Sequence, residues 1–312
     1  MSTESHISLY LVPLGGLCNR LRAIMSAISL AQELRSPLHV IWLRDAGLNA
    51  RFADLFAPLT DALLPADVRV PLSLADSSRW LVYGVARRRN LRLPSLWQRC
   101  MFDTCLTEEE LMGIMNACPS QDGLSDALRK RLRGRVLIQT GLGFYPADDS
   151  LLTHFFVPSA DVRALLEKRL KLLTPYTVGL HIRRTDNRQA ALFSPLAAFE
   201  AAMAADVRRA PQTVFYLATD DASVAAALAA AFPDKIFTSA GPASEVTPVS
   251  VAPAKGGFYA ARSSVRGMQD AVAELFTLIA CPRFHGSYWS SFSDAVAGCH
   301  ADGTADIVHV ST

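Results

Sequence analysis

The pattern of apolar and polar positions near the N-terminus predicts a strand, a helix and a second strand. A continuous apolar run covers residues 7–14, and residues 19–35 carry apolar side chains at helical spacing. Ser36 and Pro37 end this helix, and a second apolar run follows at 38–43. Continuous apolar strands joined by a helix are typical of a parallel sheet covered on both faces. The pattern therefore predicts an α/β fold.

A second alternating series of elements occupies the C-terminal half. A loop-rich stretch at 141–158 separates it from a strand predicted at 136–140. The predicted strands cover 176–182, 213–218, 235–238 and 283–286. The predicted helices cover 161–173, 195–209, 222–232 and 267–279, and a last one begins near Ser293. This order predicts two doubly wound α/β domains, 1–158 and 159–312.

The composition is that of an ordinary globular protein. Of the 312 residues, 50% are hydrophobic, which suffices for two moderate cores. The formal net charge is only +2, so nothing demands a polyanionic partner such as nucleic acid. The six cysteines form no CxxC pair and no zinc-binding pattern, and we expect reduced thiols.

Two basic runs lie in the N-terminal half, residues 87–89 with Arg92 and residues 129–131 with Arg133. Solvated helix faces explain such runs, and an acidic acceptor or a membrane surface is the alternative. The sequence shows no basic leader and no run of roughly 18 apolar residues. We therefore expect a cytoplasmic protein, with peripheral contact to the inner face of the membrane as the alternative.

Three polar segments follow predicted strands of the C-terminal half. Residues 181–186 (HIRRTD) end the first strand, 218–221 (ATDD) end the second, and 286–293 (GSYWSSFS) follow a third. Ligands bind outside the carboxyl ends of parallel strands. We therefore expect the three segments to lie along one edge of the sheet and to form one site.

The residue types of these segments suit a phosphorylated ligand. Ser290 and Ser291 precede a predicted helix, whose free backbone N–H groups and serine hydroxyls form an anion pocket. The guanidinium groups of Arg183 and Arg184 are fork-shaped donors that suit phosphate. Helix capping and surface salt bridges are the alternative roles of these serines and arginines. Two anion-binding elements beside a carboxylate segment favour a diphosphate site.

Asp270, near the start of a predicted helix, is a candidate for base recognition. Its carboxylate can accept hydrogen bonds from N1–H and from the exocyclic amine of guanine, an arrangement that adenine cannot supply. The alternative is charge complementarity at a helix N-terminus, which is what the spacing alone favours.

Two common binding motifs are missing from the sequence. Residues 15–19, after the first strand, form no G-x-G-x-x-G motif, and no P-loop lysine follows them. Asp220 and Asp221 lack the spacing with which many transferases hold a divalent ion, so we expect no metal and no cofactor. Arg183 and helix-terminus amides are then expected to stabilise a leaving diphosphate, at about 3–4 kcal/mol per well-aimed donor.

Together, these motifs resemble those of the α1,6-fucosyltransferases. More broadly, they are similar to the superfamily that includes the rhizobial nodulation, α1,2- and protein O-fucosyltransferases. The likeness covers most of residues 176–298, and the combination of HxRRTD, ATDD and Ser-Ser is specific. It rests on residues 179–203, 214–221 and 262–267, on Asp270, and on the pair Ser290-Ser291.

This resemblance implies a GT-B fold, in which two Rossmann-like domains face each other across a cleft and the second binds GDP-fucose. It also implies transfer without a metal and with inversion at the anomeric carbon. In that family pattern, Arg183 contacts the diphosphate and is the side chain most needed for activity, with Arg184 and Asp186 in support.

The resemblance further implies the residues that hold the donor. His181 and Asp270 would bind guanine, and Asp221 would lie beside the nucleotide. The segment of Ser290, Ser291 and Phe292 would bind phosphate. In the first domain the loop 15–20 would face the sugar, through Gly16 and above all Asn19.

The sequence departs from the family in one respect. The α1,6 enzymes carry a glutamate a few residues beyond the RRTD motif, proposed to deprotonate the acceptor, whereas residues 187–191 (NRQAA) contain no carboxylate. Either another group is the base, with Asp45 as a candidate, or a loose, oxocarbenium-like transition state needs little base assistance. The alternative role of Asp45 is a salt bridge with Arg44 or Arg51.

The sequence thus predicts an inverting, metal-independent glycosyltransferase that moves fucose from GDP-fucose to a glycan or glycolipid acceptor. Its partners are the nucleotide-sugar donor and a glycan or lipid-linked saccharide. A transferase that uses another GDP-sugar or activated sugar is one alternative. A non-catalytic nucleotide-sugar-binding protein is another, motivated by the missing glutamate.

Overall fold

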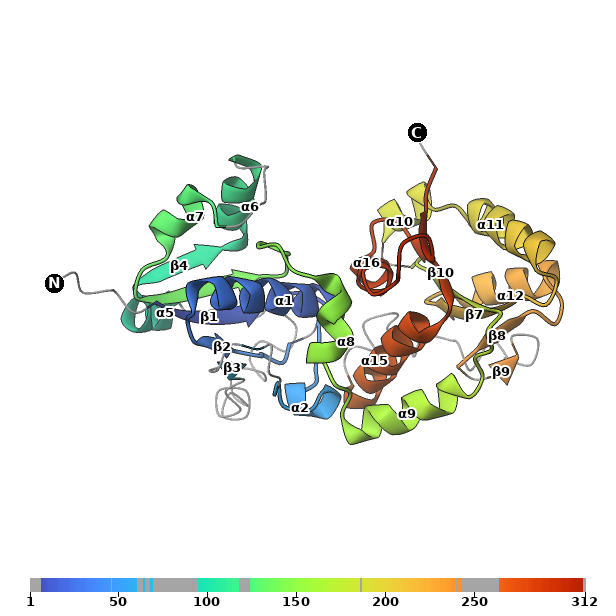
Figure 1. Cartoon of the computed structure of the whole chain (residues 1–312), viewed down its shortest axis with the longest axis horizontal. Coiled ribbons are helices and arrows are strands. Elements are labelled where there is room, and N and C mark those ends of the chain that lie inside the picture. Colours follow the sequence, from blue (N-terminus) through green and yellow to red (C-terminus); the bar gives the residue numbers. More distant parts are fainter. Residues whose placement is uncertain are drawn as a thin grey trace. The chain divides into compact units, whose positions relative to one another are not determined.

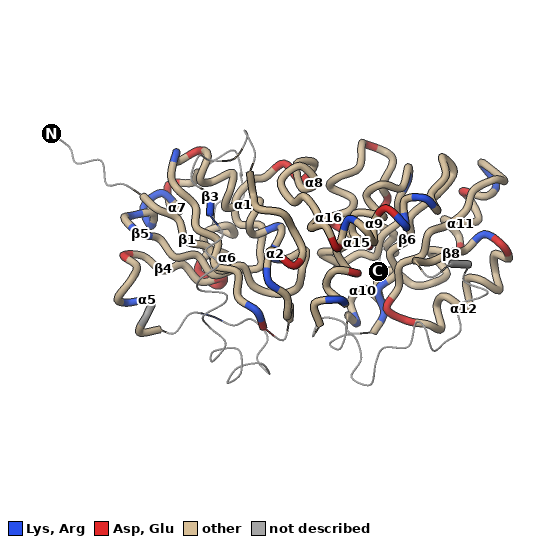
Figure 2. The backbone as a smooth tube through the Cα atoms, turned by 90° about the horizontal axis from the view of Figure 1, so that it is seen from below, with Lys and Arg blue, Asp and Glu red and all other residues tan. Residues whose placement is uncertain are grey.

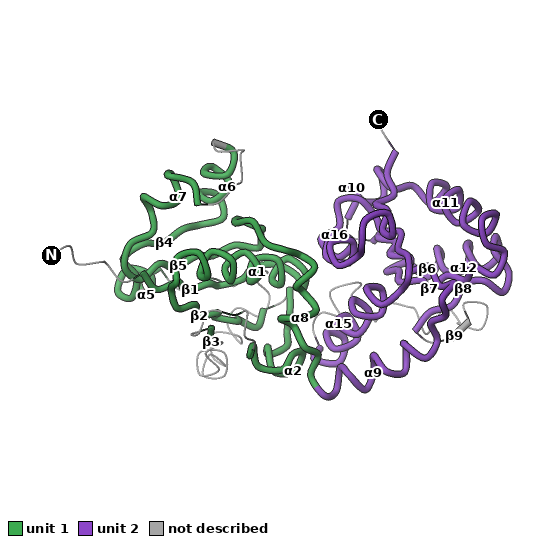
Figure 3. The backbone as a smooth tube through the Cα atoms, viewed as in Figure 1, with its two compact units in different colours: residues 1–159 green, residues 160–312 purple. Residues whose placement is uncertain are grey.

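A computed structural model shows the chain as two compact units, Met1–Ser159 and Ala160–Thr312 (Figure 3). The division lies one residue after the one drawn from the sequence. Each unit is built on its own parallel sheet. The structure describes residues 7–45, 47–60, 64, 68–69, 92, 95–117, 124–185, 187–239, 241–242 and 264–310.

The first unit contains a five-stranded parallel sheet in the order β3-β2-β1-β5-β4 (Figure 1). Its central strand β1 pairs on one side with β2 and on the other with β5, so that Leu9 stands opposite Leu38 and Val136. This strand order confirms the parallel sheet that the apolar runs predict. The strands are β1 (Ser8–Pro13), β2 (Leu38–Val40), β3 (Val68–Arg69), β4 (Thr104–Thr107) and β5 (Arg135–Thr140).

The long helix α1 (Leu17–Leu34) follows β1 and is buried along most of its length. Its apolar positions Leu21, Ile24 and Ile28 have no exposed surface, as expected for a helix whose apolar stripe faces a sheet. The helix ends where Arg35 adopts a left-handed conformation. The other helices are α2 (Phe52–Leu55), α5 (Ser95–Met101), α6 (Glu108–Ala117), α7 (Asp126–Arg131), α8 (Leu152–Phe155) and the 3₁₀ turn η1 (Asp149–Leu151).

The second apolar run forms a shorter strand than the expected 38–43. β2 ends at Val40, although Ile41, Trp42 and Leu43 stay buried. The Ile41 N–H still donates to the Leu11 carbonyl of β1, but by Leu43 the backbone has another partner, because its carbonyl accepts from the Arg20 side chain. An apolar run therefore predicted burial correctly and strand length incorrectly.

The second unit contains a six-stranded sheet in the order β11-β10-β6-β7-β8-β9. All its pairs are parallel except β8 with β9. Every residue of the central strand β6 is buried, including the polar Thr177 and His181, as expected for a strand covered on both faces. The strands are β6 (Thr177–Ile182), β7 (Val214–Thr219), β8 (Ile236–Thr238), β9 (Gly241–Pro242), β10 (Arg283–Ser287) and β11 (Ala305–Val308).

Helices cover both faces of this sheet. They are α9 (Ala160–Leu170), α10 (Arg188–Phe193), α11 (Leu196–Arg209), α12 (Ala222–Ala231), α15 (Val265–Ala280) and α16 (Ser291–Ala297). Val178, Leu180 and Ile182 of β6 pack in one core with residues of α11 and α12. The alternate residue Gly179 faces α15, where a Cβ atom would come within 3.0 Å of Leu278. This alternation is the mark of a doubly wound α/β unit.

Charged residues are interspersed along both units (Figure 2). The basic residues 129–131 end α7, where they complement the negative end of the helix, and Arg131 pairs with Glu110. The other expected basic run, 87–89, lies outside the described residues.

None of the helices described is long and apolar enough to span a membrane. Within the same parts of the chain, no group of three or more metal-ligating side chains is found.

Candidate active site

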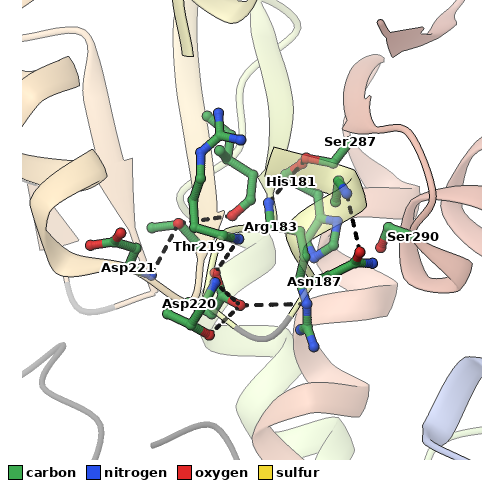
Figure 4. Close-up of polar contacts among 12 residues, drawn as sticks. His181, Arg183, Asn187, Thr219, Asp220, Asp221, Ser287 and Ser290 are labelled. Carbon is green, nitrogen blue, oxygen red and sulfur yellow. Dashed lines mark hydrogen bonds and ion pairs between the residues drawn. The ribbon is translucent and has the colours of Figure 1, made fainter. Parts of the chain in front are cut away.

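The carboxyl ends of three neighbouring strands bring the predicted segments together. β6 lies between β10 and β7, and the pairing aligns His181 with Gly286 and Ile182 with Thr219. The HIRRTD, ATDD and GSYWSSFS segments therefore leave the sheet side by side (Figure 4). This edge, at the carboxyl ends of the strands, is the one at which open parallel sheets bind their ligands.

Asp220 organises the turn that carries the two arginines. Its carboxylate accepts hydrogen bonds from the backbone N–H of Arg184 at 2.8 Å and from the Thr185 hydroxyl at 2.8 Å. It also forms an ion pair with Nε of Arg183 at 3.4 Å. Figure 4 shows these contacts converging on Asp220 from the turn that follows β6. The carboxylate thus fixes the backbone and one guanidinium of the turn.

The sequence interpretation singled out Asp221 and missed Asp220. Asp221 caps α12, since its carboxylate accepts from the Ser223 N–H at 2.9 Å. A signal in the sequence could have separated the two aspartates. Asp220 directly follows a strand, whereas Asp221 directly precedes the helical pattern of α12, which begins at residue 222, and these two positions have different roles. The predicted place of Asp221 beside a nucleotide is neither supported nor opposed by this cap.

Arg183 is held at its backbone as well as at its side chain. Its N–H donates to the Ser287 hydroxyl at 3.0 Å, and that hydroxyl donates to the His181 carbonyl at 3.2 Å. Ser287 of β10, which the sequence interpretation also missed, therefore links the ends of β10 and β6. The Arg183 side chain is mostly buried against Asp220. A buried, fixed guanidinium is a preorganised donor for an anion.

Arg184 has one buried nitrogen without a partner. Its Nη1 donates to the Ser194 carbonyl at 2.8 Å, whereas its buried Nη2 has no hydrogen-bond partner among the residues that the structure describes. Burial lowers the pKa of this guanidinium, against the attraction of Asp220 and Asp221. An unsatisfied buried donor is costly, so this nitrogen suits an anionic ligand. Asp186, the predicted support of this pair, lies outside the described residues.

His181 is a buried, neutral imidazole. Its ring stacks on Phe292 at a centroid distance of 4.7 Å, and Nδ1 lies 2.8 Å from the Ser293 hydroxyl. Burial lowers its pKa to about 3, aided by the charge of Arg183 and opposed by Asp220. The structure therefore brings His181 and Phe292 together, as a ring pair between β6 and α16.

The two predicted phosphate-binding serines have different environments. Ser290 is buried and caps α16, because its hydroxyl accepts from the Ser293 N–H at 3.4 Å. This is the capping role that the sequence interpretation held as the alternative. Ser291 is the first residue of α16 and is partly exposed. Of the two hydroxyls, that of Ser291 is the more accessible to a ligand.

Asp270 belongs to an ion-pair network between α15 and α9. Its carboxylate accepts from Arg169 at 3.0 Å and lies 3.4 Å from Nε of Arg266. Arg169 also pairs with Glu274 at 2.9 Å, and the Tyr216 hydroxyl donates to Glu274 at 3.0 Å. Burial raises the pKa of Glu274, against the attraction of Arg169. The half-exposed Asp270 is thus oriented by two arginines.

The predicted sugar-facing loop of the first unit is tightly packed. Gly15 has a positive φ of 84°, and a Cβ atom there would come within 2.8 Å of the Asn19 amide. Gly16 precedes α1 as its N-cap residue, and Asn19 accepts from Arg22 at 3.0 Å. The loop therefore presents Asn19 at the beginning of α1, next to the end of β1.

Asp45 is not placed to act as a base. It pairs with the fully buried Arg20 at 2.9 Å and accepts from the Gly47 and Leu48 N–H groups at 2.8 and 3.0 Å. The carboxylate is buried and surrounded by donors, so an acceptor hydroxyl cannot reach it. The expected partners of the alternative salt bridge were also wrong. Arg44 instead binds Asn49, and Arg51 pairs with Asp54.

Comparison with known proteins gives matches by structure alone. No protein-family model and no curated protein matches the chain. NodZ alpha-1,6-fucosyltransferase soaked with GDP-fucose is 16% identical at a TM-score of 0.58, and the match covers 94% of this chain and 93% of that one. Fucosyltransferase NodZ from Bradyrhizobium is 17% identical at a TM-score of 0.58, over 93% and 91%.

A second group of similar structures is POFUT1. Its complex with GDP-fucose is 11% identical at a TM-score of 0.56, and the match covers 99% of this chain and 100% of that one. At such identities the likeness concerns the fold, and it extends over both units. The chain therefore has the two-unit, Rossmann-like α/β fold of the NodZ and POFUT1 structures.

Proposed function

We propose that the protein is a glycosyltransferase that moves fucose from GDP-fucose to a glycan or glycolipid acceptor. The observation that carries the proposal is the arginine turn after β6, which Asp220 and Ser287 hold in place and in which Arg184 keeps a buried nitrogen unpaired. The turn stands at the ligand-binding edge of a GT-B fold. Of the proteins with a similar fold, POFUT1 forms a complex with GDP-fucose, and the NodZ crystal was soaked with GDP-fucose.

In this proposal the second unit binds the donor. Arg183 and Arg184 contact the diphosphate, with Asp186 in support. The segment of Ser290, which caps α16, and Ser291 binds phosphate. The neutral His181, stacked on Phe292, and the carboxylate of Asp270 take the guanine. Asp221 lies beside the nucleotide, and the first unit, on the acceptor side, faces the sugar through Gly16 and Asn19 of its loop 15–20. Arg169 and Arg266 also engage the Asp270 carboxylate.

The reaction requires little covalent chemistry from the protein. The acceptor oxygen bonds to the anomeric carbon as that carbon loses its bond to the diphosphate oxygen, so the configuration inverts. Negative charge develops on the leaving GDP, where each well-aimed guanidinium donor contributes about 3–4 kcal/mol. No metal is assigned a role in this scheme. The proton of the acceptor hydroxyl passes to a base that we do not assign, since residues 187–191 contain no carboxylate.

A thermal-shift titration tests the donor assignment. GDP and GDP-fucose are expected to raise the melting temperature, and UDP- and dTDP-sugars are not. At a hundredfold excess over the dissociation constant the stabilisation is about 2.7 kcal/mol. Stabilisation by UDP compounds alone would remove the guanine assignment. GDP-mannose in the same series distinguishes a transferase for another GDP-sugar.

A second candidate function is nucleotide-sugar binding without catalysis. The specific observation in its favour is that Asn187, in the segment where the family carries its glutamate, caps α10 and has no acidic group. Donor hydrolysis or transfer that Arg183→Ala abolishes, without loss of folding, would eliminate this candidate. Binding of GDP-fucose with no turnover in either protein would favour it.

A further inference from the structure

An exposed pair of aromatic rings lies directly beside the arginine turn. Trp289 has 58% and Tyr288 40% of its surface exposed. The two rings meet edge to face at 5.7 Å, and Tyr288 also contacts Phe193 at 5.9 Å and His309 at 5.4 Å. The rings thus come from the end of β10, supported by α10 and by the segment after β11.

The backbone at Trp289 is held in a strained conformation. Its φ is +58°, a region that costs a bulky residue roughly 1 kcal/mol or more. The Asn187 amide donates to the Trp289 carbonyl at 2.7 Å, and the Tyr288 N–H donates to the Ser194 hydroxyl at 2.8 Å. Burial of the indole does not offset this strain, because most of the ring is exposed. Backbone strain that the packing of the side chain does not offset is typical of a functional position.

The same contacts join the ring pair to the proposed donor site. Ser194 accepts from Arg184 through its carbonyl and from Tyr288 through its hydroxyl. Trp289 lies between Ser287, which holds the Arg183 backbone, and Ser290, which caps α16. A molecule on the rings is therefore next to the arginine turn, whereas Asp270 is on α15 and is held by α9.

We propose that Tyr288 and Trp289 form a stacking platform for a pyranose ring of the glycan acceptor. One face of a pyranose presents C–H groups, which pack on the electron-rich face of an aromatic ring, while its hydroxyls stay hydrated at the rim. Because the two rings stand at 76° to each other, they offer one stacking face and a flanking edge, which suits a single sugar ring, whereas a stable protein interface needs about 800 Å² on each partner. The occupant follows from the proposed function, because transfer requires a sugar hydroxyl beside the donor.

Fluorine NMR of the full chain labelled with fluorotryptophan tests this platform. The chain has four tryptophans, and the signal that disappears in Trp289→Asn belongs to Trp289. The probes are the methyl pyranosides of glucose, galactose, mannose and N-acetylglucosamine at millimolar concentrations, with glycerol as a hydroxyl control that lacks a ring face. At least one pyranoside is expected to shift the Trp289 signal selectively, and glycerol is not.

The variants are chosen so that folding does not confuse the result. Asparagine tolerates a positive φ better than tryptophan, so Trp289→Asn is expected to fold. Saturation-transfer NMR on the sugar should show affinity for the active pyranoside about tenfold weaker in this variant, as for one lost stacking contact. Trp289→Phe should restore most of it. Leu96→Ala, which removes an exposed apolar side chain of the first unit, should change nothing.

Two outcomes would overturn the platform. One is that no pyranoside moves the Trp289 signal, and the other is that Trp289→Asn binds the sugar as well as the parent chain does. GDP affinity, measured in the same samples by melting, separates this result from the proposed function. Intact GDP binding without sugar binding refutes the platform alone, whereas absent GDP binding refutes the donor assignment whatever the sugar does.

Discussion

Each unit contains an arginine–aspartate pair at the ends of its strands, and the two pairs differ in one respect. Arg20 and Asp45 in the first unit are fully enclosed, with the guanidinium bound to two carbonyls and packed 5.0 Å over Trp42. Arg183 and Asp220 in the second unit retain some exposure, and the neighbouring Arg184 keeps an unpaired nitrogen. The first pair is closed and the second is open to a ligand.

The difference shows how the same residue types serve either the fold or a site. The fully buried Arg20–Asp45 pair holds its neighbours in place and has almost no exposed surface for a further partner, although Arg20 Nη2, 2.9 Å from Asp45, makes no well-aligned hydrogen bond among the described residues. The Arg183–Asp220 pair is partly exposed, and the buried Nη2 of the neighbouring Arg184 carries the cost of a missing partner in the free protein. Substitutions in the first pair should therefore act on stability, and those in the second on ligand binding and turnover.

The largest effect is expected for Arg20→Leu. The change leaves Asp45 buried without its cation, which costs about 3–5 kcal/mol and is expected to prevent folding or lower the melting temperature strongly. Urea unfolding of the full chain measures it. Adding Asp45→Asn should recover part of the loss, since the amide oxygen still accepts from Gly47 and Leu48. A stable single variant would show that the pair is dispensable.

Arg183→Ala should reduce activity and leave stability nearly unchanged, which is the opposite of the effect expected for Arg20→Leu. We expect turnover of GDP-fucose to fall about 100- to 1,000-fold, as for the loss of one transition-state donor, with the melting temperature of the free protein nearly unchanged. Steady-state kinetics and melting are measured on the same preparation. Arg208→Ala, which removes an exposed arginine of α11, is the matched control. Equal losses in both variants would mean that net charge, and no specific contact, is responsible.

The neutral state of His181 predicts acid sensitivity. The pKa of His181 is about 3 in the folded protein, against an ordinary value of 6.5. Between pH 6.5 and about pH 3, therefore, the unfolded chain takes up the proton and the folded chain does not. Stability is therefore complete above about pH 6.5 and falls as the pH drops toward 3, by about 2–3 kcal/mol at pH 4.5. In His181→Asn the difference between pH 7 and pH 4.5 in the free energy of unfolding should shrink by that amount. An unchanged pH profile would contradict the assignment.

Asp220→Asn tests whether the open pair needs a charge. The amide oxygen can still accept from the Arg184 N–H, but the attraction for the Arg183 guanidinium is lost. We expect GDP affinity to fall about tenfold, which is 1.4 kcal/mol, in an isothermal titration. Asp302→Asn makes the same change of net charge at an exposed position and should bind GDP normally. If both lose affinity alike, Asp220 does not organise the turn.

The smallest effect is expected for Ser290→Ala. Loss of an N-cap costs about 1 kcal/mol of stability, and thermal unfolding should show it. If the hydroxyl of Ser291 is the one that meets phosphate, Ser291→Ala should instead weaken GDP binding while leaving the melting temperature unchanged. If Ser290→Ala weakened GDP binding and Ser291→Ala lowered the melting temperature, the roles of the two serines would be exchanged.

Local patterns predicted β1, β2 and β5 of the first sheet, β6, β7, β8 and β10 of the second, and the three segments of the site, but not β3, β4 or β9. Apolar runs gave the buried strands, because a parallel strand covered on both faces must be apolar throughout. Helical spacing gave α1, α11, α12 and α15. The same reasoning missed the short elements α10 and β11, whose few residues carry no clear period.

The amino-acid sequence by itself indicated, within one residue, where β6, β7 and β10 end, and therefore which polar segments meet at one edge of the second sheet. Only the tertiary structure decided which side chains touch there. Asp220 meets Arg184, Ser287 meets Arg183, and Arg20 meets Asp45 across 36, 104 and 25 positions of the chain. Such contacts depend on the strand order and on the face to which each side chain points, and neither leaves a mark in the local pattern.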